Sequence, residues 1–180
     1  MAAITTTDTI RAAQAIGITT SAFLAGTITS ISVLSVPSLL LAPSPVAAEQ
    51  WAALYDRGKK YAPSLAVFGS LFHALAAYQA YNHPFAVAHP SAWKLYAVAA
   101  VATVAIAPYT LLVMAPTNDS LHQKEQELKG QGLAEDVKEG ALGLGGESTK
   151  ALLDRWGTLN LIRGVFPLVG AAAAVWATLP

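Results

Sequence analysis

The chain has no cysteine and few charged residues. Only 12% of its 180 residues are charged, whereas soluble domains average about 25%. The missing cysteine excludes disulfides, thiolate catalysis, iron–sulfur clusters and cysteine zinc sites. The formal net charge is zero, so a nucleic-acid-binding role has no electrostatic support. A nucleotide-binding glycine motif, a flavin fingerprint and a pair of haem histidines are also missing.

Hydrophobic residues make up 54% of the chain, and the mean hydropathy is +0.45. A helix that crosses a membrane needs ~20 mostly apolar residues. Four stretches meet this requirement, at about residues 12–36, 63–81, 93–115 and 160–179. We expect the last to extend backwards as an amphipathic helix to about Thr149. The sequence thus predicts an all-α bundle of four transmembrane helices, a single integral membrane domain over residues 1–180, with a long charged loop at 116–148.

The first apolar stretch is rich in small and hydroxyl residues. Gly17, Ser21 and Ala25 recur every fourth residue, and such rows let helix backbones approach closely in lipid. We expect Pro37 to help end this helix. The stretch is longer than the 7–15 apolar residues of a signal peptide, so we expect it to remain in the protein as a span.

The fourth span opens with a polar stripe. Trp156, Asn160 and Arg163 stand at positions i, i+4 and i+7, which lie within roughly 60° of one helix face. An ionisable residue at membrane depth is costly and is a functional-site candidate by default. The alternative is that Arg163 extends to a lipid headgroup while Trp156 joins the interfacial aromatic belt.

His73 is the one histidine inside a predicted span. A neutral imidazole in the membrane is cheaper than a charge but still needs a hydrogen-bond partner. It could act as a general base or a metal ligand. It could equally make an interhelical hydrogen bond to a serine or threonine of the first span. The spacing of His83 and His89 is no metal signature, and we predict no metal site.

Asn118 and Asp119 follow the third span directly. Together with Pro116 and Ser120 they are the residue types that a helix stop and restart would use. Alternatively, the two residues belong to a functional site. The third span must end at the membrane face where the fourth span begins. That shared depth is the reason to group Asn118 and Asp119 with the polar stripe of the fourth span.

These two motifs resemble the anthrone oxygenase family. The segment Pro-Thr-Asn-Asp-Ser-Leu at 116–121 and the pattern Trp156-x-x-x-Asn160-x-x-Arg163 carry the resemblance. The family consists of small four-helix membrane proteins that are prominent in fungal polyketide pathways. The resemblance implies a membrane-bound monooxygenase that converts an anthrone to an anthraquinone. It also implies no flavin, haem or metal, with molecular oxygen as the co-substrate.

This activity requires a base and a group that stabilises an oxyanion, because the anthrone methylene must lose a proton before the anion meets oxygen. On this hypothesis His73 is the base, with Asp119 or Asp154 as alternatives. Arg163 and Asn160 stabilise the oxyanion by charge and hydrogen bonding.

The remaining site residues are expected to hold the substrate. Trp156 would stack on the aromatic tricycle, and Asn118 and Asp119 would contact it at the membrane face. The implied partners are a small aromatic polyketide, the lipid bilayer and, functionally, a polyketide synthase. We expect an endoplasmic reticulum or related endomembrane location, and a homodimer is one expected assembly. Two alternatives stay open: an enzyme of the same fold acting on another phenolic or quinoid metabolite, and a non-catalytic scaffold or lipophile carrier.

Overall fold

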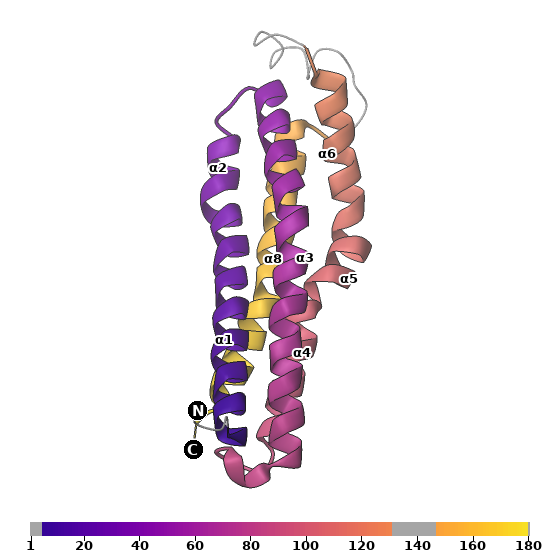
Figure 1. Ribbon diagram of the computed structural model, residues 1–180. Coiled ribbons are helices and arrows are strands. Elements are labelled where there is room, and N and C mark those ends of the chain that lie inside the picture. The colour runs from indigo at the N-terminus through magenta and orange to yellow at the C-terminus, as the bar shows by residue number, and fades with distance from the viewer. Residues whose placement is uncertain (1–4, 131–146, 180) are drawn as a thin grey trace. The chain divides into compact units, whose positions relative to one another are not determined.

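The computed structural model describes residues 5–130 and 147–179, and all regular secondary structure in this part of the chain is helical (Figure 1). The predicted all-α class is therefore confirmed. In chain order the elements are α1 (Thr6–Ser30), η1 (Ile31–Ser35), α2 (Val36–Leu39), α3 (Ser44–Asn82), η2 (Pro84–Ala86), α4 (Ala92–Val104), α5 (Ile106–Tyr109), η3 (Thr110–Met114), α6 (Ala115–Leu128) and α8 (Thr149–Trp176).

Three helical stretches are long and apolar enough to cross a membrane: Thr6–Leu39, Ala92–Leu128 and Thr149–Trp176. Large apolar side chains such as Phe23 and Leu112 are exposed on them, as expected of helices that face lipid. This is the pattern of a multi-pass membrane protein. Helix α3 contains the predicted span 63–81 but is not among the three. A fourth crossing therefore stays a prediction.

The chain divides into two compact units. Unit 1 comprises Met1–Thr27, Ala62–Pro108 and Gly164–Pro180, and unit 2 comprises Ile28–Tyr61 and Tyr109–Arg163. Each unit takes one segment from each of the four long helical stretches. Each therefore has its own four-helix core.

The core of unit 1 is built mainly of alanine. Its fully buried residues are Ala13, Ala76, Ala80, Ala92, Tyr96, Ala99, Ala174 and Ala177. Gly17, Ser21 and Ala25 are buried on α1 as the small-residue row predicts. Small side chains let helix backbones approach closely, which is how helices pack where lipid removes the hydrophobic driving force.

The core of unit 2 is built of large side chains. Its buried residues are Val36, Ala47, Trp51, Met114, Leu121, Leu152, Leu153 and Trp156. Trp51 and Trp156 meet edge to face, with ring centroids 5.9 Å apart. Such pairs add stability beyond the area that they bury.

Two prolines that were expected to end helices lie inside continuous helical stretches. The helix does not end at Pro37 but runs to Leu39, and the third helical stretch does not stop at Pro116, because α6 continues through it to Leu128. Each proline occupies the first turn of an α-helical segment, behind a π-helical segment, η1 or η3. A first-turn position suits proline because its missing N–H would find no partner there in any case.

The other helix boundaries are confirmed in one case and corrected in another. α8 begins at Thr149, as the backward extension of the fourth span predicts. α3 begins at Ser44 rather than at 63, and Pro63 lies within it on an exposed side. An exposed proline in a helix removes one backbone hydrogen bond and leaves the freed carbonyl accessible. Residues 131–146 of the predicted loop lie outside the described residues.

Candidate functional site

Arg163, on α8 in unit 2, has only uncharged hydrogen-bond partners. Its Nη1 donates to Thr110 Oγ1 at 3.2 Å, and its Nη2 donates to Asn160 Oδ1. Its Nε is buried and has no acceptor among the described residues. No carboxylate of residues 5–130 or 147–179 forms an ion pair with it. The described part of unit 2 thus supplies no counter-ion to this cation.

Asn160 fixes the position of this guanidinium. The Asn160 amide is fully buried, and its Nδ2 donates to the Ile28 carbonyl at 3.0 Å and to Ser32 Oγ at 2.8 Å. With both donors directed at the first helical stretch, Oδ1 is the atom left to accept from Arg163. Asn160 therefore orients the cation, and its own donors are already occupied.

Both hydroxyl partners of this pair lie in π-helical segments. Ser32 belongs to η1 and Thr110 belongs to η3. A π-helical turn changes the i→i+4 hydrogen-bond register, and such turns occur frequently at functional sites. Each turn here presents a hydroxyl to the polar pair on α8. Sequence motifs did not indicate Ser32 or Thr110, and the available signal was a proline that follows each within six residues.

Trp156 and Asn118 contact each other directly. The indole Nε1 of Trp156 donates to Asn118 Oδ1 at 2.9 Å, and both residues are buried in unit 2. These two predicted site residues are therefore in contact, and a shared role in one site stays a prediction. The alternative for Asn118, a helix stop and restart, is wrong because α6 runs through it. Asp119 and Asp154 have exposed side chains on α6 and α8.

Trp156 packs against Trp51, which belongs to an aromatic cluster with Tyr55 and His122 that the motifs did not indicate. Trp51 stacks on Tyr55 at 5.2 Å between ring centroids. The His122 ring lies edge-on to Trp51 at 4.9 Å and to Tyr55 at 5.1 Å. The available signal was the i, i+4 spacing of Trp51 and Tyr55, which places two aromatic rings on one helix face. The sequence interpretation placed no helix there.

His73 lies in unit 1 and is fully buried on α3. Its Nε2 is hydrogen bonded to Ser21 Oγ at 2.9 Å, and Ser21 Oγ is hydrogen bonded to Thr103 Oγ1 at 3.0 Å. The interhelical bond to a serine of the first span is therefore present. Its Nδ1 has no partner in the described part of unit 1. The ring packs so closely on α1 that a Cβ at Gly17 would lie 2.7 Å from Nδ1.

Asp56 and Lys59 form an exposed ion pair on α3, with 2.6 Å between Oδ1 and Nζ. The hydrogen bond from Lys59 lowers the pKa of Asp56 below its ordinary value, and the same bond raises the pKa of Lys59. Solvent screens such pairs strongly. This pair belongs to the surface of unit 2.

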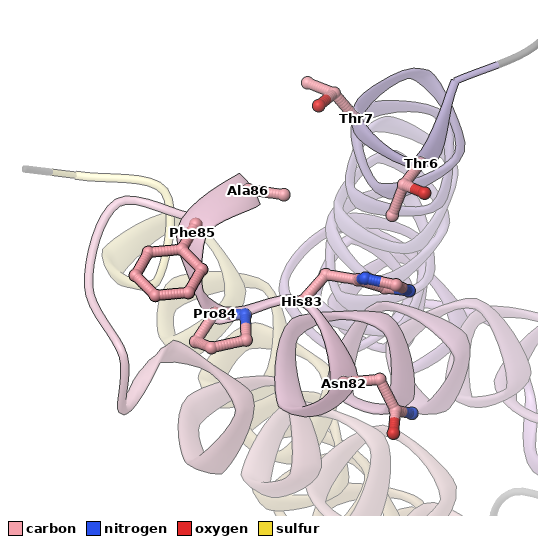
Figure 2. A pocket seen from close by; sticks show the side chains of 7 residues that line it. All are labelled: Thr6, Thr7, Asn82, His83, Pro84, Phe85 and Ala86. Atoms are coloured by element: carbon pink, nitrogen blue, oxygen red, sulfur yellow. The ribbon is translucent and has the colours of Figure 1, made fainter.

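A shallow pocket of about 350 Å³ lies in unit 1, between the start of α1 and the link from α3 to α4 (Figure 2). Thr6, His83 and Phe85 help to line it. None of the predicted site residues contributes to this pocket. No group of three histidine, aspartate or glutamate residues in the described ranges is arranged to hold a metal ion.

Comparison with known proteins agrees with the resemblance that the two motifs carry. The family model described as "Anthrone oxygenase" matches residues 51–173. "Anthrone oxygenase AgnL2" of Paecilomyces divaricatus is 33% identical over 162 residues, which cover 88% of this chain and 90% of that relative. "Noranthrone monooxygenase" of Aspergillus flavus is 27% identical over 158 residues, which cover 87% of this chain and 68% of that relative. No solved structure matches the chain. The chain belongs to the anthrone oxygenase family.

Proposed function

We propose that this protein oxidises a polyketide anthrone to the corresponding anthraquinone with molecular oxygen, and that Arg163 stabilises the anionic form of the substrate. Family membership supports the reaction class, since its relatives are named as anthrone oxygenases and a noranthrone monooxygenase. The residue roles are our inference from the contacts in the two units.

The observation that carries the proposal is the unpaired cation of unit 2. Among the described residues, the half-buried guanidinium of Arg163 bonds only Thr110 and Asn160 and lacks charge compensation. A charge withdrawn from water is costly without an anion. An anthrone anion would provide that negative charge, with its oxygen near the free Nε. Stabilisation of this kind is strongest where the donors are already fixed in position and water is excluded. Asn160, held by the first helical stretch, provides that fixation for Arg163.

The chemistry needs no further oxidant. Loss of a proton from the methylene opposite the carbonyl turns the anthrone into an aromatic phenolate. This anion transfers one electron to oxygen, and the resulting radicals combine to form a carbon–oxygen bond. The peroxide then loses water and leaves a second carbonyl. One anthrone and one oxygen molecule give one anthraquinone and one water.

His73 remains our candidate for the base. If Nε2 carries the proton and donates to Ser21, Ser21 can donate onward to Thr103, and Nδ1 keeps a free lone pair. That tautomer suits a proton acceptor. Asp119 and Asp154 remain the alternative bases on unit 2, where both are exposed.

Trp156, Asn118 and Asp119 are proposed to contact the substrate. The bond from Trp156 to Asn118 fixes the indole edge, and a fixed aromatic ring can pack on a flat tricycle with little loss of entropy. Asn118 Nδ2 is a donor suited to a phenol oxygen. Asp119 would contact the substrate from the exposed side of α6.

A membrane location suits an apolar, poorly soluble substrate. We propose an endoplasmic reticulum or related endomembrane, where the substrate can arrive from a soluble polyketide synthase and partition into the bilayer. A homodimer is compatible with this arrangement and forms part of the proposal.

The test is an oxidation assay with the protein purified in detergent or nanodiscs. We expect emodin anthrone to be converted to emodin faster than the spontaneous background, with stoichiometric oxygen uptake and no conversion under anaerobic conditions. A rate equal to that of empty nanodiscs would refute the proposal. Transport of the anthrone between vesicles without its oxidation would favour the carrier alternative.

A further inference from the structure

The indole N–H of Trp51 is the observation that carries a further inference. Trp51 is fully buried in unit 2, and its Nε1 has no acceptor among the described residues. Its ring is well packed, stacked on Tyr55 and meeting His122 and Trp156 edge-on. The packing explains why an aromatic residue stands here. It does not explain an indole, because burying a donor without an acceptor is unfavourable.

Trp156 is a natural comparison within the same aromatic cluster. Its indole contacts that of Trp51 at 5.9 Å between centroids, and its N–H donates to Asn118 Oδ1 at 2.9 Å. The described residues of unit 2 therefore supply an acceptor to one buried indole and none to the other. The difference points to an acceptor for Trp51 that comes from outside the described chain.

Two more donors of unit 2 share this property. Thr117 Oγ1 and Arg163 Nε are buried and have no acceptor in the described part of the unit. Thr117 directly precedes Asn118, the partner of Trp156. All three unpaired atoms can donate, and the guanidinium and the indole can only donate. Any ligand that reaches one of these donors must offer an acceptor oxygen, and a hydroxylated, carbonyl-bearing aromatic carries several.

We propose that Trp51 is a substrate-binding residue whose Nε1 donates a hydrogen bond to a ring-hydroxyl oxygen of the anthrone. This inference rests on the proposed oxidation and extends it to substrate choice. Trp51 would favour anthrones that carry ring hydroxyl groups over the unsubstituted compound. A site built to bond a substrate hydroxyl disfavours an analogue that lacks it, because the site's own polar group stays unpaired.

The decisive variant is Trp51→Phe, which keeps an aromatic ring and removes the N–H. We expect its KM for emodin anthrone to rise about 3- to 10-fold, the effect of one neutral hydrogen bond. We expect its KM for unsubstituted anthrone to stay within about 2-fold of wild type, because that substrate has no ring hydroxyl to accept the Trp51 hydrogen bond. The kcat for either substrate should change little.

Trp93→Phe is the matched control, because Trp93 lies in unit 1, packs against Tyr81 and has no role in the proposed site. Its KM and kcat should match those of wild type for both anthrones. A Trp51→Phe enzyme with the same ratio of KM values for the two anthrones as wild type would overturn the inference. The same result is expected if a water molecule accepts the Trp51 hydrogen bond. Wild-type protein that oxidises neither anthrone would instead refute the proposed function.

A second measurement avoids substitution. Emodin is stable in air and can be added to protein whose tryptophans are labelled with ¹⁵N. We expect the Trp51 indole N–H resonance to move downfield on binding and the Trp156 resonance to move less. Emodin that protects the protein against thermal unfolding while leaving the Trp51 resonance unmoved would contradict the inference and leave the proposed function intact.

Discussion

The two units solve the same problem, burial of polar side chains in a helical membrane protein, in different ways. In unit 1 the polar groups are small and neutral: Ser21, His73 and Thr103 bond to one another inside an alanine core. In unit 2 the polar groups include the guanidinium of Arg163 and hydroxyls from two π-helical segments, beside a core of large side chains. Unit 1 leaves one buried side-chain atom of its described residues without a partner, and unit 2 leaves three.

The chemistry of the side chains explains this difference. In unit 1 both hydroxyls of the Ser21–His73–Thr103 chain are paired, because a hydroxyl can both donate and accept, and only His73 Nδ1 lacks a partner among the described residues. Arginine and tryptophan side chains only donate, so they depend on acceptors supplied by other groups. A surplus of buried donors is therefore a better indicator of a binding site than the number of polar residues.

The largest effect should come from Arg163→Met, which removes the unpaired cation and keeps much of the side-chain length. We expect kcat to fall about 100- to 1000-fold, the loss typical of one oxyanion-stabilising donor. Arg155→Met is the control, because Arg155 lies on the same helix, is exposed and pairs with Glu147 at 3.5 Å. Initial rates of quinone formation, divided by the amount of folded protein, measure both. A wild-type rate in Arg163→Met would show that the charge of Arg163 does not contribute to the reaction.

The next effect should come from His73→Gln. A glutamine can still bond Ser21 but cannot accept the substrate's proton, so we expect a rate loss of about 100-fold, the low end for general-base catalysis. Ser21→Ala is the partner variant, since it loses the hydrogen bond and leaves the imidazole in place. A His73→Gln enzyme that inserts normally and turns over at the wild-type rate would make this histidine structural, and the contrast between the units would sharpen.

Gly170→Ala tests the close packing of unit 1. A Cβ at Gly170 would overlap Thr103 Oγ1 and lie 3.0 Å from the Ala99 carbonyl oxygen. We expect a loss of about 1–3 kcal/mol in unfolding free energy, as overpacking typically costs. Gly26→Ala is the control, because nothing lies within 4 Å of its added Cβ. Thermal unfolding in detergent measures both, and equal midpoints would show that unit 1 is looser than its contacts indicate.

The smallest effect should come from Asp56→Asn, which removes the exposed ion pair with Lys59. The pKa of Asp56 is lowered in the folded state, so its contribution to stability is present above its unfolded pKa and is lost as the pH falls through the folded value. Because solvent screens the pair, we expect no measurable change in activity at neutral pH and little change in stability. A clear loss of either would mean that this surface takes part in the site.

The helical class and part of the candidate site could be predicted from the sequence. Long apolar stretches leave helices as the way to satisfy the backbone in lipid, and the spacing of Trp156, Asn160 and Arg163 fixes their common face on any helix. The contact between Trp156 and Asn118 also followed, because membrane depth constrains where two helix ends can meet. The sequence did not predict correctly that the helices continue through Pro37 and Pro116. A proline is compatible with either a helix stop or the first turn of a helix.

What only the tertiary structure decided is which polar atoms find partners. From their residue types, Arg163, Trp156 and His73 were expected to need hydrogen-bond partners. The structure shows that Asn160 donates to Ile28 and Ser32. It also shows that His73 is hydrogen bonded to Ser21. The sequence likewise could not distinguish Trp51 from Trp156, two tryptophans with opposite hydrogen-bond states. Periodicity sets the face on which a side chain stands. Its partner depends on how helices distant in sequence pack and on where a π-helical turn rotates a hydroxyl toward it.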